Sequence, residues 1–155
     1  MHKKYEVMKA EDLMIGDYVC VKVQVDDTGT EPVFETTPKR VTELTKGIYG
    51  IYAEGASEFA GAEIEPIPLT TEILEQNGFV PIRQNAGEPY YWQYFDKKDG
   101  SIVNAFRRIY RGLWIECSNA TTEASTNKQC EFVHELQHAI KNTEIKMEVV
   151  VCVSK

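Results

Sequence analysis

The chain has 155 residues, a length typical of about one domain, and can bury a hydrophobic core without disulfides or metal ions. Its 24 acidic and 17 basic side chains give a formal net charge of −7, which disfavours binding to the phosphate backbone of nucleic acids. No window approaches the roughly 18 apolar residues of a membrane-spanning helix. The four cysteines form no Cys-x-x-Cys pair and are expected to be mostly buried, reduced thiols. We therefore expect a cytoplasmic protein without membrane attachment.

The first third of the sequence is rich in short runs of β-branched and aromatic residues. In LMIGDYVCVKVQV, valines recur at every second position from Val19 to Val25, which predicts a half-buried strand after a Gly-Asp turn. The runs VFETT, KRVTEL and GIYGIYAE follow, separated by Pro or Gly, and predict further short strands. We therefore expect residues 1–68 to form a small SH3-like barrel or a curled antiparallel sheet.

The segment PIPLTTEILEQNGF carries the start and stop signals of a short helix. Thr70 is suited to cap the helix N-terminus, and an apolar residue before it can pack on the first turn as a hydrophobic staple. Gly78 stands where a left-handed residue commonly ends a helix. This helix marks the expected border between residues 1–68 and a second region, residues 69–155.

An aromatic hairpin is expected next. YYWQYFDKKDGSIVNAF predicts an aromatic strand, a turn and a return strand, and RGLWIEC predicts a third strand. Alternation along the first strand places its aromatic residues on two faces, and one of these faces can stack bases or bind a peptide. With three nearby arginines it forms a candidate interaction surface, whose members are Tyr90, Trp92, Tyr94, Arg107, Arg108 and Arg111. The alternative is that the aromatic residues form sheet core and cross-strand pairs, while the arginines protect a solvated edge.

The last part of the chain predicts a loop, a helix and a strand. The stretch SNATTEASTN is polar, and Thr126-Asn127-Lys128-Gln129 at its end matches a capping box that starts an amphipathic helix. After the helix, IKMEVVVCV first alternates and then becomes continuously apolar, which predicts a terminal strand. The predicted fold class is therefore α+β, with the short helix, the antiparallel hairpin, the amphipathic helix and the terminal strand following the first sheet.

The stretch EFVHELQHAI contains the HExxH motif of zinc peptidases. His134 and His138 are four residues apart, so both rings can reach one zinc ion from the same side of a helix. Glu135 would then act as the general base on the metal-bound water. Glu144 is the candidate third ligand, although Lys141 replaces the glycine of the longer HExxHxxGxxH pattern.

The helical wheel argues against this zinc site. The apolar residues of the predicted helix form one stripe, made of Phe132, Val133, Leu136, Ala139 and Ile140. The direction midway between His134 and His138 lies roughly opposite the centre of that stripe, so the histidines are expected to face away from the core. We therefore expect solvated or surface-packed histidines and no metal or other cofactor, with zinc as the alternative.

Three stretches in this order, LMIGDYV, PIPLTTEILEQNGF and FVHELQHAI, resemble a family of small uncharacterised proteins encoded by Bacteroidetes and their prophages or mobile elements. The resemblance covers much of the chain, and the order and spacing of the stretches carry it, because each motif is short. It implies that Asn is usual at the position of His138, on a helix whose role needs no zinc. It also implies that Asn142 takes the left-handed turn of a glycine. The family implies no activity, substrate or ligand.

Together these patterns predict a non-enzymatic binding or accessory protein of phage or mobile-element origin, with a protein as its partner. The alternative is a minimal zinc metallopeptidase that uses His134 and His138 as ligands and Glu135 as base. A weaker alternative is a nucleic-acid-binding module that uses the aromatic strand and the three arginines.

Overall fold

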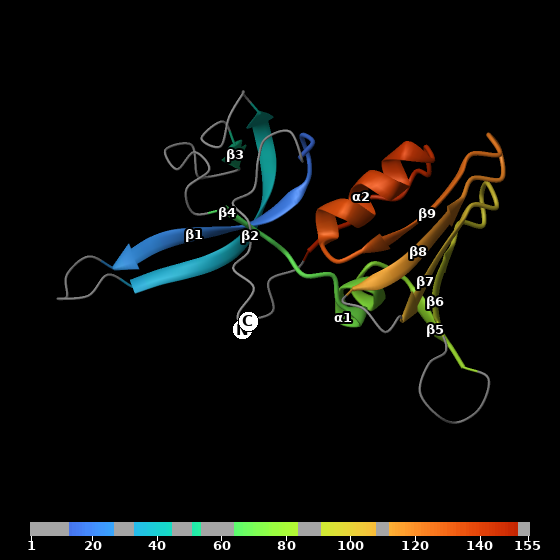
Figure 1. Cartoon of the computed structure of the whole chain (residues 1–155), viewed down its shortest axis with the longest axis horizontal. Coiled ribbons are helices and arrows are strands. Elements are labelled where there is room, and N and C mark those ends of the chain that lie inside the picture. Colours follow the sequence, from blue (N-terminus) through green and yellow to red (C-terminus); the bar gives the residue numbers. More distant parts are fainter. Residues whose placement is uncertain are drawn as a thin grey trace. The chain divides into compact units, whose positions relative to one another are not determined.

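The computed structural model describes residues 13–26, 33–44, 51–53, 64–83, 91–107 and 112–151. Over these residues the protein has an α+β fold with two antiparallel sheets and two helices (Figure 1). The chain divides into two compact units, residues 1–67 with 153–155, and residues 68–152. The four-stranded sheet belongs to the first unit, and the five-stranded sheet and both helices belong to the second.

The sheet of the first unit has antiparallel strands in the order β3-β2-β1-β4. Its strands are β1 (Tyr18–Asp26), β2 (Val33–Leu44), β3 (Ile51–Ala53) and β4 (Ile64–Pro66). Within the described residues β3 and β4 are the two edges, so this sheet is open. The predicted antiparallel sheet is confirmed, whereas closure into a barrel is not seen in the described part of the chain.

Strand β2 corrects one expectation from the sequence. VFETT and KRVTEL are predicted as separate strands, yet they form one strand that continues through Pro38, opposite Cys20 of β1. Proline has no N–H to donate, so a sheet accepts it only where no neighbouring strand needs that donor. Strand β3 pairs with the end of β2, from Val41 onward, and in the described residues it does not reach Pro38. The outer edge of β2 therefore tolerates the proline.

A tight turn leads into β1, as the sequence predicts. Gly16 has φ +94° at the third position of the turn, a conformation that glycine adopts at little steric cost. The N–H of Asp17 donates to the carbonyl of Met14 at 3.0 Å, and the Asp17 carboxylate accepts the N–H of Met14 at 2.7 Å. Val19, which follows in β1, is fully buried.

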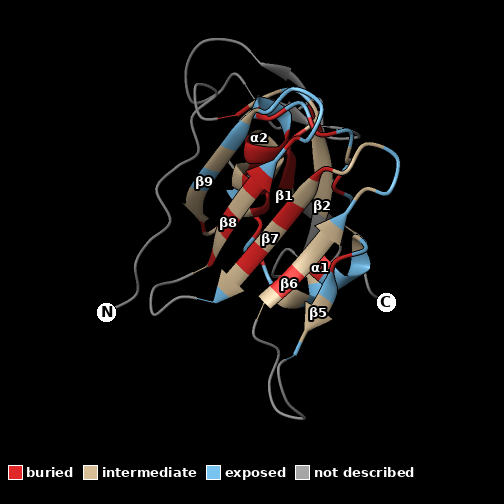
Figure 2. Ribbon diagram, turned by 90° about the vertical axis from the view of Figure 1, so that its right-hand side faces the viewer, coloured by how far each residue is buried: buried red, intermediate tan, exposed pale blue. Residues whose placement is uncertain are grey.

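The second unit is an antiparallel meander with its helices on one face. The strands follow chain order and are β5 (Val80–Ile82), β6 (Tyr91–Phe95), β7 (Ile102–Arg107), β8 (Leu113–Ser118) and β9 (Ser125–Cys130). Helix α1 (Thr71–Gln76) contacts β6, and helix α2 (Val133–Asn142) contacts β8 and β9. Figure 2 shows the strands in front and α2 behind them. We call the helix side the covered face and the opposite side the open face.

Helix α1 has the ends that its sequence predicts. Thr70 Oγ1 accepts a backbone N–H of the first turn at 3.3 Å. At the other end Gly78 has φ +87°, and its N–H donates to the carbonyl of Glu75. The N–H of Phe79 donates to the carbonyl of Leu74, which completes a Schellman motif. The predicted cap and stop signals are both confirmed.

The main core of the second unit lies between the covered face and α2. The buried side chains that fill it are Trp92, Val103, Ala105, Leu113, Ile115, Cys117 and Cys130 from the strands and Val133, Leu136, Ala139 and Ile140 from α2. Strand register explains why these residues meet, because Trp92 lies opposite Ala105 and Ala105 lies opposite Ile115. Full burial of a large aliphatic or aromatic side chain contributes about 1.5–3 kcal/mol, so this core is the main source of stability in the unit.

Helix α2 begins later than the sequence predicts. The expected capping box, residues 126–129, belongs instead to β9 and pairs with β8. The helix starts at Val133 with Phe132 as its N-cap residue. Glu135 caps it from inside the first turn, because its carboxylate accepts the N–H groups of Glu131 and Phe132, each at 2.9 Å. Pairing with a neighbouring strand thus overrides a local helix signal.

Helix α2 ends in a Schellman motif with a non-glycine residue in the left-handed position. The N–H of Ile145 donates to the carbonyl of Ile140 at 3.3 Å, and the N–H of Glu144 donates to that of Lys141 at 3.0 Å. Glu144 has φ +58°, so Glu144, and not Asn142, takes the left-handed turn. This conformation costs a residue with a Cβ about 1 kcal/mol or more.

The segment after α2 is not a sheet strand where the structure describes it. Residues 145–151 alternate in burial but pair with neither sheet, so the predicted terminal strand is wrong for this part. The last residues of that predicted strand lie outside the described ranges. Asn77 holds the segment, because its Nδ2–H donates to the carbonyl of Val150 at 2.8 Å and its Oδ1 accepts the N–H of Val150 at 2.7 Å. A side-chain amide therefore replaces a neighbouring strand here.

Candidate functional site

The histidines of the HExxH motif lie differently from the prediction of the helical wheel. His134 is only 7% exposed, and its ring stacks on that of Phe132 with centroids 5.9 Å apart. His138 is half-buried and meets the ring of His134 edge-on at 5.6 Å. The predicted outward orientation is wrong for His134. The wheel treats Phe132 as part of the apolar stripe, but Phe132 is an extended N-cap residue with φ −125°, and its ring lies against His134.

The carboxylates of the predicted zinc site are engaged or distant. Glu135 accepts two backbone N–H groups at the start of α2. The helix continues for four residues after His138, about 6 Å along its axis, and exposed Glu144 lies beyond its end. In the part of the chain that the structure describes, no three His, Cys, Asp or Glu side chains come together as metal ligands. In this structure Glu135 is a helix-capping group.

The described members of the predicted interaction surface lie on the covered face. Trp92 is 2% exposed, and Tyr94 on the same face packs against Phe79 with ring centroids 5.8 Å apart. The guanidinium of Arg107 lies 5.1 Å from the centroid of the Trp92 ring, a cation–π contact. Trp92 therefore belongs to the core, and its assignment to an interaction surface is corrected. The remaining members of the predicted surface, outside the described residues, are Tyr90, Arg108 and Arg111.

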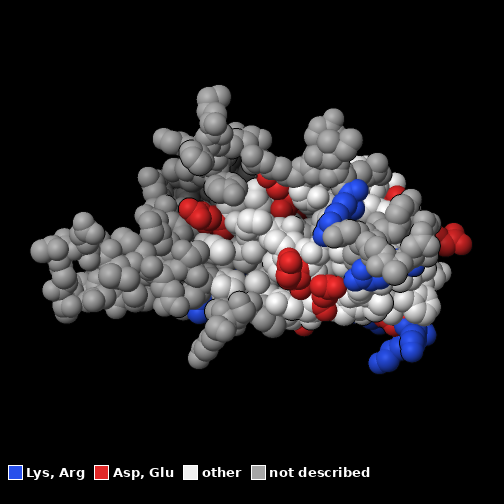
Figure 3. Space-filling view, turned by 90° about the horizontal axis from the view of Figure 1, so that it is seen from below, with Lys and Arg blue, Asp and Glu red and all other residues white. Residues whose placement is uncertain are grey.

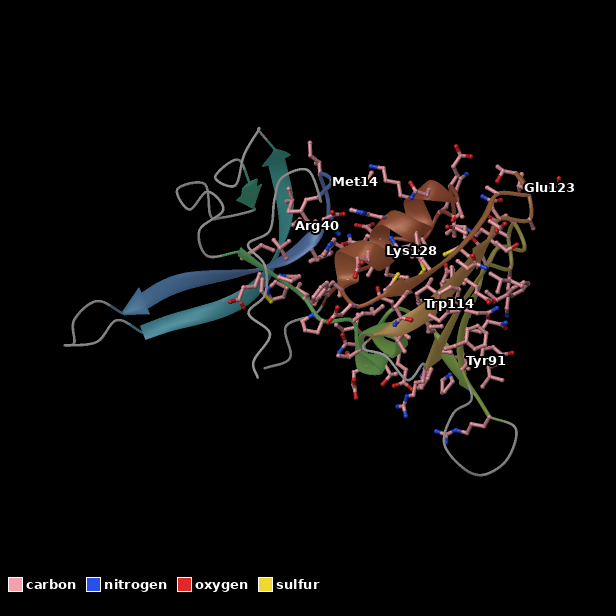
Figure 4. The ribbon with its side chains drawn as sticks, in the orientation of Figure 1. Met14, Arg40, Tyr91, Trp114, Glu123 and Lys128 are labelled. Atoms are coloured by element: carbon pink, nitrogen blue, oxygen red, sulfur yellow. The ribbon has the colours of Figure 1, made fainter. Side chains whose placement is uncertain are left out.

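The open face carries a row of aromatic side chains across three neighbouring strands. Tyr91 lies opposite Phe106, and Phe106 lies opposite Trp114. Ile82 and Gln129 extend this row to the two edges of the sheet. The rings of Tyr91 and Phe106 stack with centroids 5.2 Å apart. Figure 4 labels Tyr91 and Trp114 among the side chains of the sheet. These five half-buried residues are called the aromatic row below.

Two further rows follow along the strands. The polar row contains Gln93, Asn104, Glu116 and Asn127, and exposed Val80 of β5 lies at its edge opposite Gln93. Gln93 Nε2–H donates to Asn104 Oδ1 at 2.9 Å, and Trp114 Nε1–H donates to Glu116 Oε1 at 3.3 Å. The second of these hydrogen bonds joins the polar row to the aromatic row. The third row contains Phe95, Ile102, Ser118 and Ser125.

Charge is nearly absent from the open face. Glu116 is the one charged side chain among the residues of β5–β9 that alternate onto this face, and none of them is Lys or Arg. The described charges lie mainly elsewhere, and the view in Figure 3 includes acidic as well as basic side chains. Aromatic, aliphatic, amide and hydroxyl groups therefore define the chemistry of the open face. These groups can pack on apolar side chains and exchange hydrogen bonds with a neutral partner.

Two cysteines lie on the covered face near α2. Cys117 and Cys130 are buried, free thiols. Burial raises the pKa of Cys117 to about 11 and the pKa of Cys130 to about 12. Both thiols stay protonated at neutral pH and are poor nucleophiles, which agrees with the expectation of structural thiols. Burial also raises the pKa of half-buried Cys20, and Cys152 lies outside the described residues.

The sequence does contain a signal for the open face. In β7 and β8, polar residues stand at Asn104 and Glu116, whereas the neighbouring positions 103, 105, 115 and 117 are apolar. Alternation in these two strands therefore shows which side faces a core. For β6, the side that faces the core follows only from the register of β6 with β7. The sequence of β6 alone does not reveal this register.

Comparison with protein-family models, with curated proteins and with solved structures finds no match. Among the described residues, no helix has the length and apolar character needed to cross a membrane. The open face, with its three rows of side chains, is the feature of the described structure on which a functional proposal rests.

Proposed function

We propose that this protein is a non-enzymatic binding protein that docks a protein partner on the open face of its five-stranded sheet. The observation that carries the proposal is the aromatic row beside a polar row with a single charge. Aromatic residues are enriched and charged residues are depleted at the cores of protein–protein interfaces. Nucleic acid is disfavoured, because none of the described residues of β5–β9 that alternate onto this face is a Lys or Arg that could neutralise phosphate.

The geometry of the aromatic row supports the same choice of partner. Tyr91 and Phe106 stack on each other, so one face of each ring is already covered. Recognition of single-stranded nucleic acid relies on stacking of bases on free aromatic faces. Aliphatic and aromatic side chains of a protein can instead pack on the ring edges. Both observations favour a protein over the nucleic-acid alternative.

The expected origin and location belong to this proposal. The resemblance to proteins of Bacteroidetes prophages and mobile elements rests on the sequence stretches alone. A reducing compartment such as the cytoplasm is supported by the free thiols of Cys117 and Cys130, because oxidising compartments favour disulfides.

A random peptide library displayed on phage tests the proposed function. Clones are selected on the full-length protein and then compared on the variants Phe106→Ser and Trp114→Ser. We expect clones whose affinity falls about tenfold or more in either variant, because truncation of a central interface aromatic commonly costs more than 1 kcal/mol.

The matched control for this selection is Glu75→Gln, which changes an exposed residue of α1. The control should bind every selected clone as the wild-type protein does. Circular dichroism confirms that the variants are folded. If repeated selection yields no clone that depends on the open face, the proposal is wrong.

A further inference from the structure

The size of the open face limits the kind of partner that can cover it. The sheet has five strands, and its central strands have six residues. With about 4.8 Å per strand and about 3.4 Å per residue, the plane of the face measures roughly 24 by 20 Å, or about 500 Å² without the relief of its side chains. A standard interface buries about 800 Å² on each partner. The face is therefore small for a globular partner, whereas an extended segment of about six residues matches the length of its central strands.

The register of β7 and β8 divides the middle of the open face into three sites. Each site is one cross-strand pair, and the pairs are Phe106 with Trp114, Asn104 with Glu116, and Ile102 with Ser118. Successive pairs are two residues apart along each strand, a spacing of about 6.8 Å. An extended peptide presents its same-side side chains with the same spacing. A segment lying along these strands can therefore place one side chain on each pair.

Building on the proposed function, we infer that the open face binds an extended segment whose inward side chains are apolar, basic and apolar at successive second positions. The first apolar side chain packs on Phe106 and Trp114, and the second packs on Ile102. The basic side chain pairs with Glu116, whose carboxylate faces no Lys or Arg of β5–β9 on this face. Because the pattern reads the same in both directions, it holds for either orientation of the segment.

The carboxylate of Glu116 decides which side chain fits the middle position of the bound segment. Glu116 Oε1 accepts the Nε1–H of Trp114 at 3.3 Å, which orients the carboxylate beside the aromatic row. Asn104 lies opposite Glu116 and is neutral, and its Oδ1 accepts Gln93 Nε2–H at 2.9 Å. Lys or Arg of the segment supplies a counter-charge to Glu116, which the described residues of this face do not provide, whereas Asp or Glu is repelled.

A second copy of this chain is the main other occupant to consider. Twofold docking through the open face would bring together two chains that each carry a net charge of −7. The face is also small for the interface of a stable dimer. Both arguments favour a segment of another protein.

Two synthetic peptides, acetylated and amidated, test the inference. Both carry threonine at every second position, and the positions between are leucine, arginine and leucine in one peptide and leucine, glutamate and leucine in the other. Binding to the full-length protein is followed by the fluorescence of Trp114, with buried Trp92 as a constant background, and by backbone amide shifts. We expect the arginine peptide to bind about fivefold more tightly, with the largest shifts in β7 and β8.

Charge exchange at Glu116 makes the test specific. Glu116→Lys should reverse the preference between the two peptides, and Glu116→Gln, which keeps the size of the side chain, should remove it. Glu75→Lys, the control on exposed α1, should keep the wild-type preference. Equal affinities of the two peptides for the wild-type protein, or a preference that survives in Glu116→Lys, would overturn the inference.

The inference and the proposed function fail in different ways. If the phage library yields clones that depend on Trp114 but the arginine peptide does not bind, the inference is wrong and the proposed function stands. If neither the library nor the peptides bind, both are wrong. If the wild-type protein sediments as a dimer that Trp114→Ser dissociates, a second copy occupies the face and the inference is wrong.

Discussion

The two tryptophans of this chain lie on opposite faces of the same sheet, and their surroundings differ. Trp92 on β6 is 2% exposed and packs in the core, with the guanidinium of Arg107 over its ring. Trp114 on β8 is half-buried, lies in the aromatic row and donates to Glu116. Trp92 therefore belongs to the core, whereas Trp114 lies on the face that the helices leave uncovered.

This difference shows that cover by the helices, and not the type of residue, decides whether an aromatic side chain of this sheet belongs to the core. Aromatic residues occur on both, but the covered face adds small and aliphatic residues such as Ala105 and Ile115, while the open face adds amides and hydroxyls. An antiparallel sheet can leave one face in water, provided that polar side chains share it. The three half-buried rings of the aromatic row share the open face with such polar side chains.

The largest expected effect is a difference in the free energy of unfolding between variants on the two faces. Ile115→Ala should lower the free energy of unfolding by about 3 kcal/mol, because Ile115 is fully buried and the change leaves a cavity. Trp114→Ser, one residue away on the open face, should lower it by only about 1 kcal/mol. Urea denaturation measures both values. Equal losses in the two variants would contradict the assignment of the faces.

The next effect concerns the hydrogen bonds that join the covered face to the end of α2. Asn119 is 4% exposed, its Nδ2–H donates to the carbonyl of Thr143 at 2.9 Å, and its Oδ1 accepts the N–H of Thr121 at 2.9 Å. Asn119→Ala should cost about 2 kcal/mol, because buried polar groups lose their partners. Asn127→Ala, the same change at an exposed position of the open face, should cost less than about 0.5 kcal/mol. Thermal denaturation at several urea concentrations can compare them, and similar costs would count against a special role of Asn119.

The buried thiols make the covered face sensitive to alkaline pH. Folding raises the pKa of Cys117 from 9.0 to about 11 and that of Cys130 from 9.0 to about 12, so above pH 9 the unfolded state binds fewer protons than the folded state. The free energy of unfolding should therefore be unaffected by these groups below about pH 9. It should fall as the pH rises further, by up to about 1.4 kcal/mol per pH unit for each thiol.

Cysteine variants isolate this contribution. Cys130→Ala should be less stable than the wild-type protein at pH 7, because a buried side chain is shortened, but its stability should fall less steeply between pH 9 and 11. Urea denaturation across this pH range gives both slopes. Parallel curves for the variant and the wild-type protein would show that Cys130 does not titrate in this way.

The smallest effect is a gain in stability at the end of the covering helix. Glu144→Gly should raise the free energy of unfolding by about 0.5–1 kcal/mol, because φ +58° suits glycine better than a residue with a Cβ. Glu144→Ala removes the same carboxylate and keeps the Cβ, so it should give no such gain. A differential scanning calorimetry experiment on both variants tests this point. A gain of equal size with alanine would assign the effect to charge instead of backbone conformation.

Signals that act over a few residues predicted local structure correctly. Thr70 and Gly78 mark the ends of α1 because a cap and a Schellman motif involve only neighbouring backbone groups. The capping pattern at residues 126–129 failed for the opposite reason, since these residues pair with β8 and the pairing outweighs the local preference. For the candidate site, alternation in β6 showed which aromatic residues share a face, but it did not show which face the helices cover.

By itself, the sequence determined the α+β class, helix α1, the strand pattern around the hairpin and the reduced, buried character of Cys117 and Cys130. Only the tertiary structure decided that Trp92 is core and Trp114 is surface, that Glu135 caps α2, and that Asn77 holds the segment after α2. The physical reason is the range of the interactions. Propensities, caps and turns act between near neighbours, whereas burial and register depend on contacts between residues far apart in the chain.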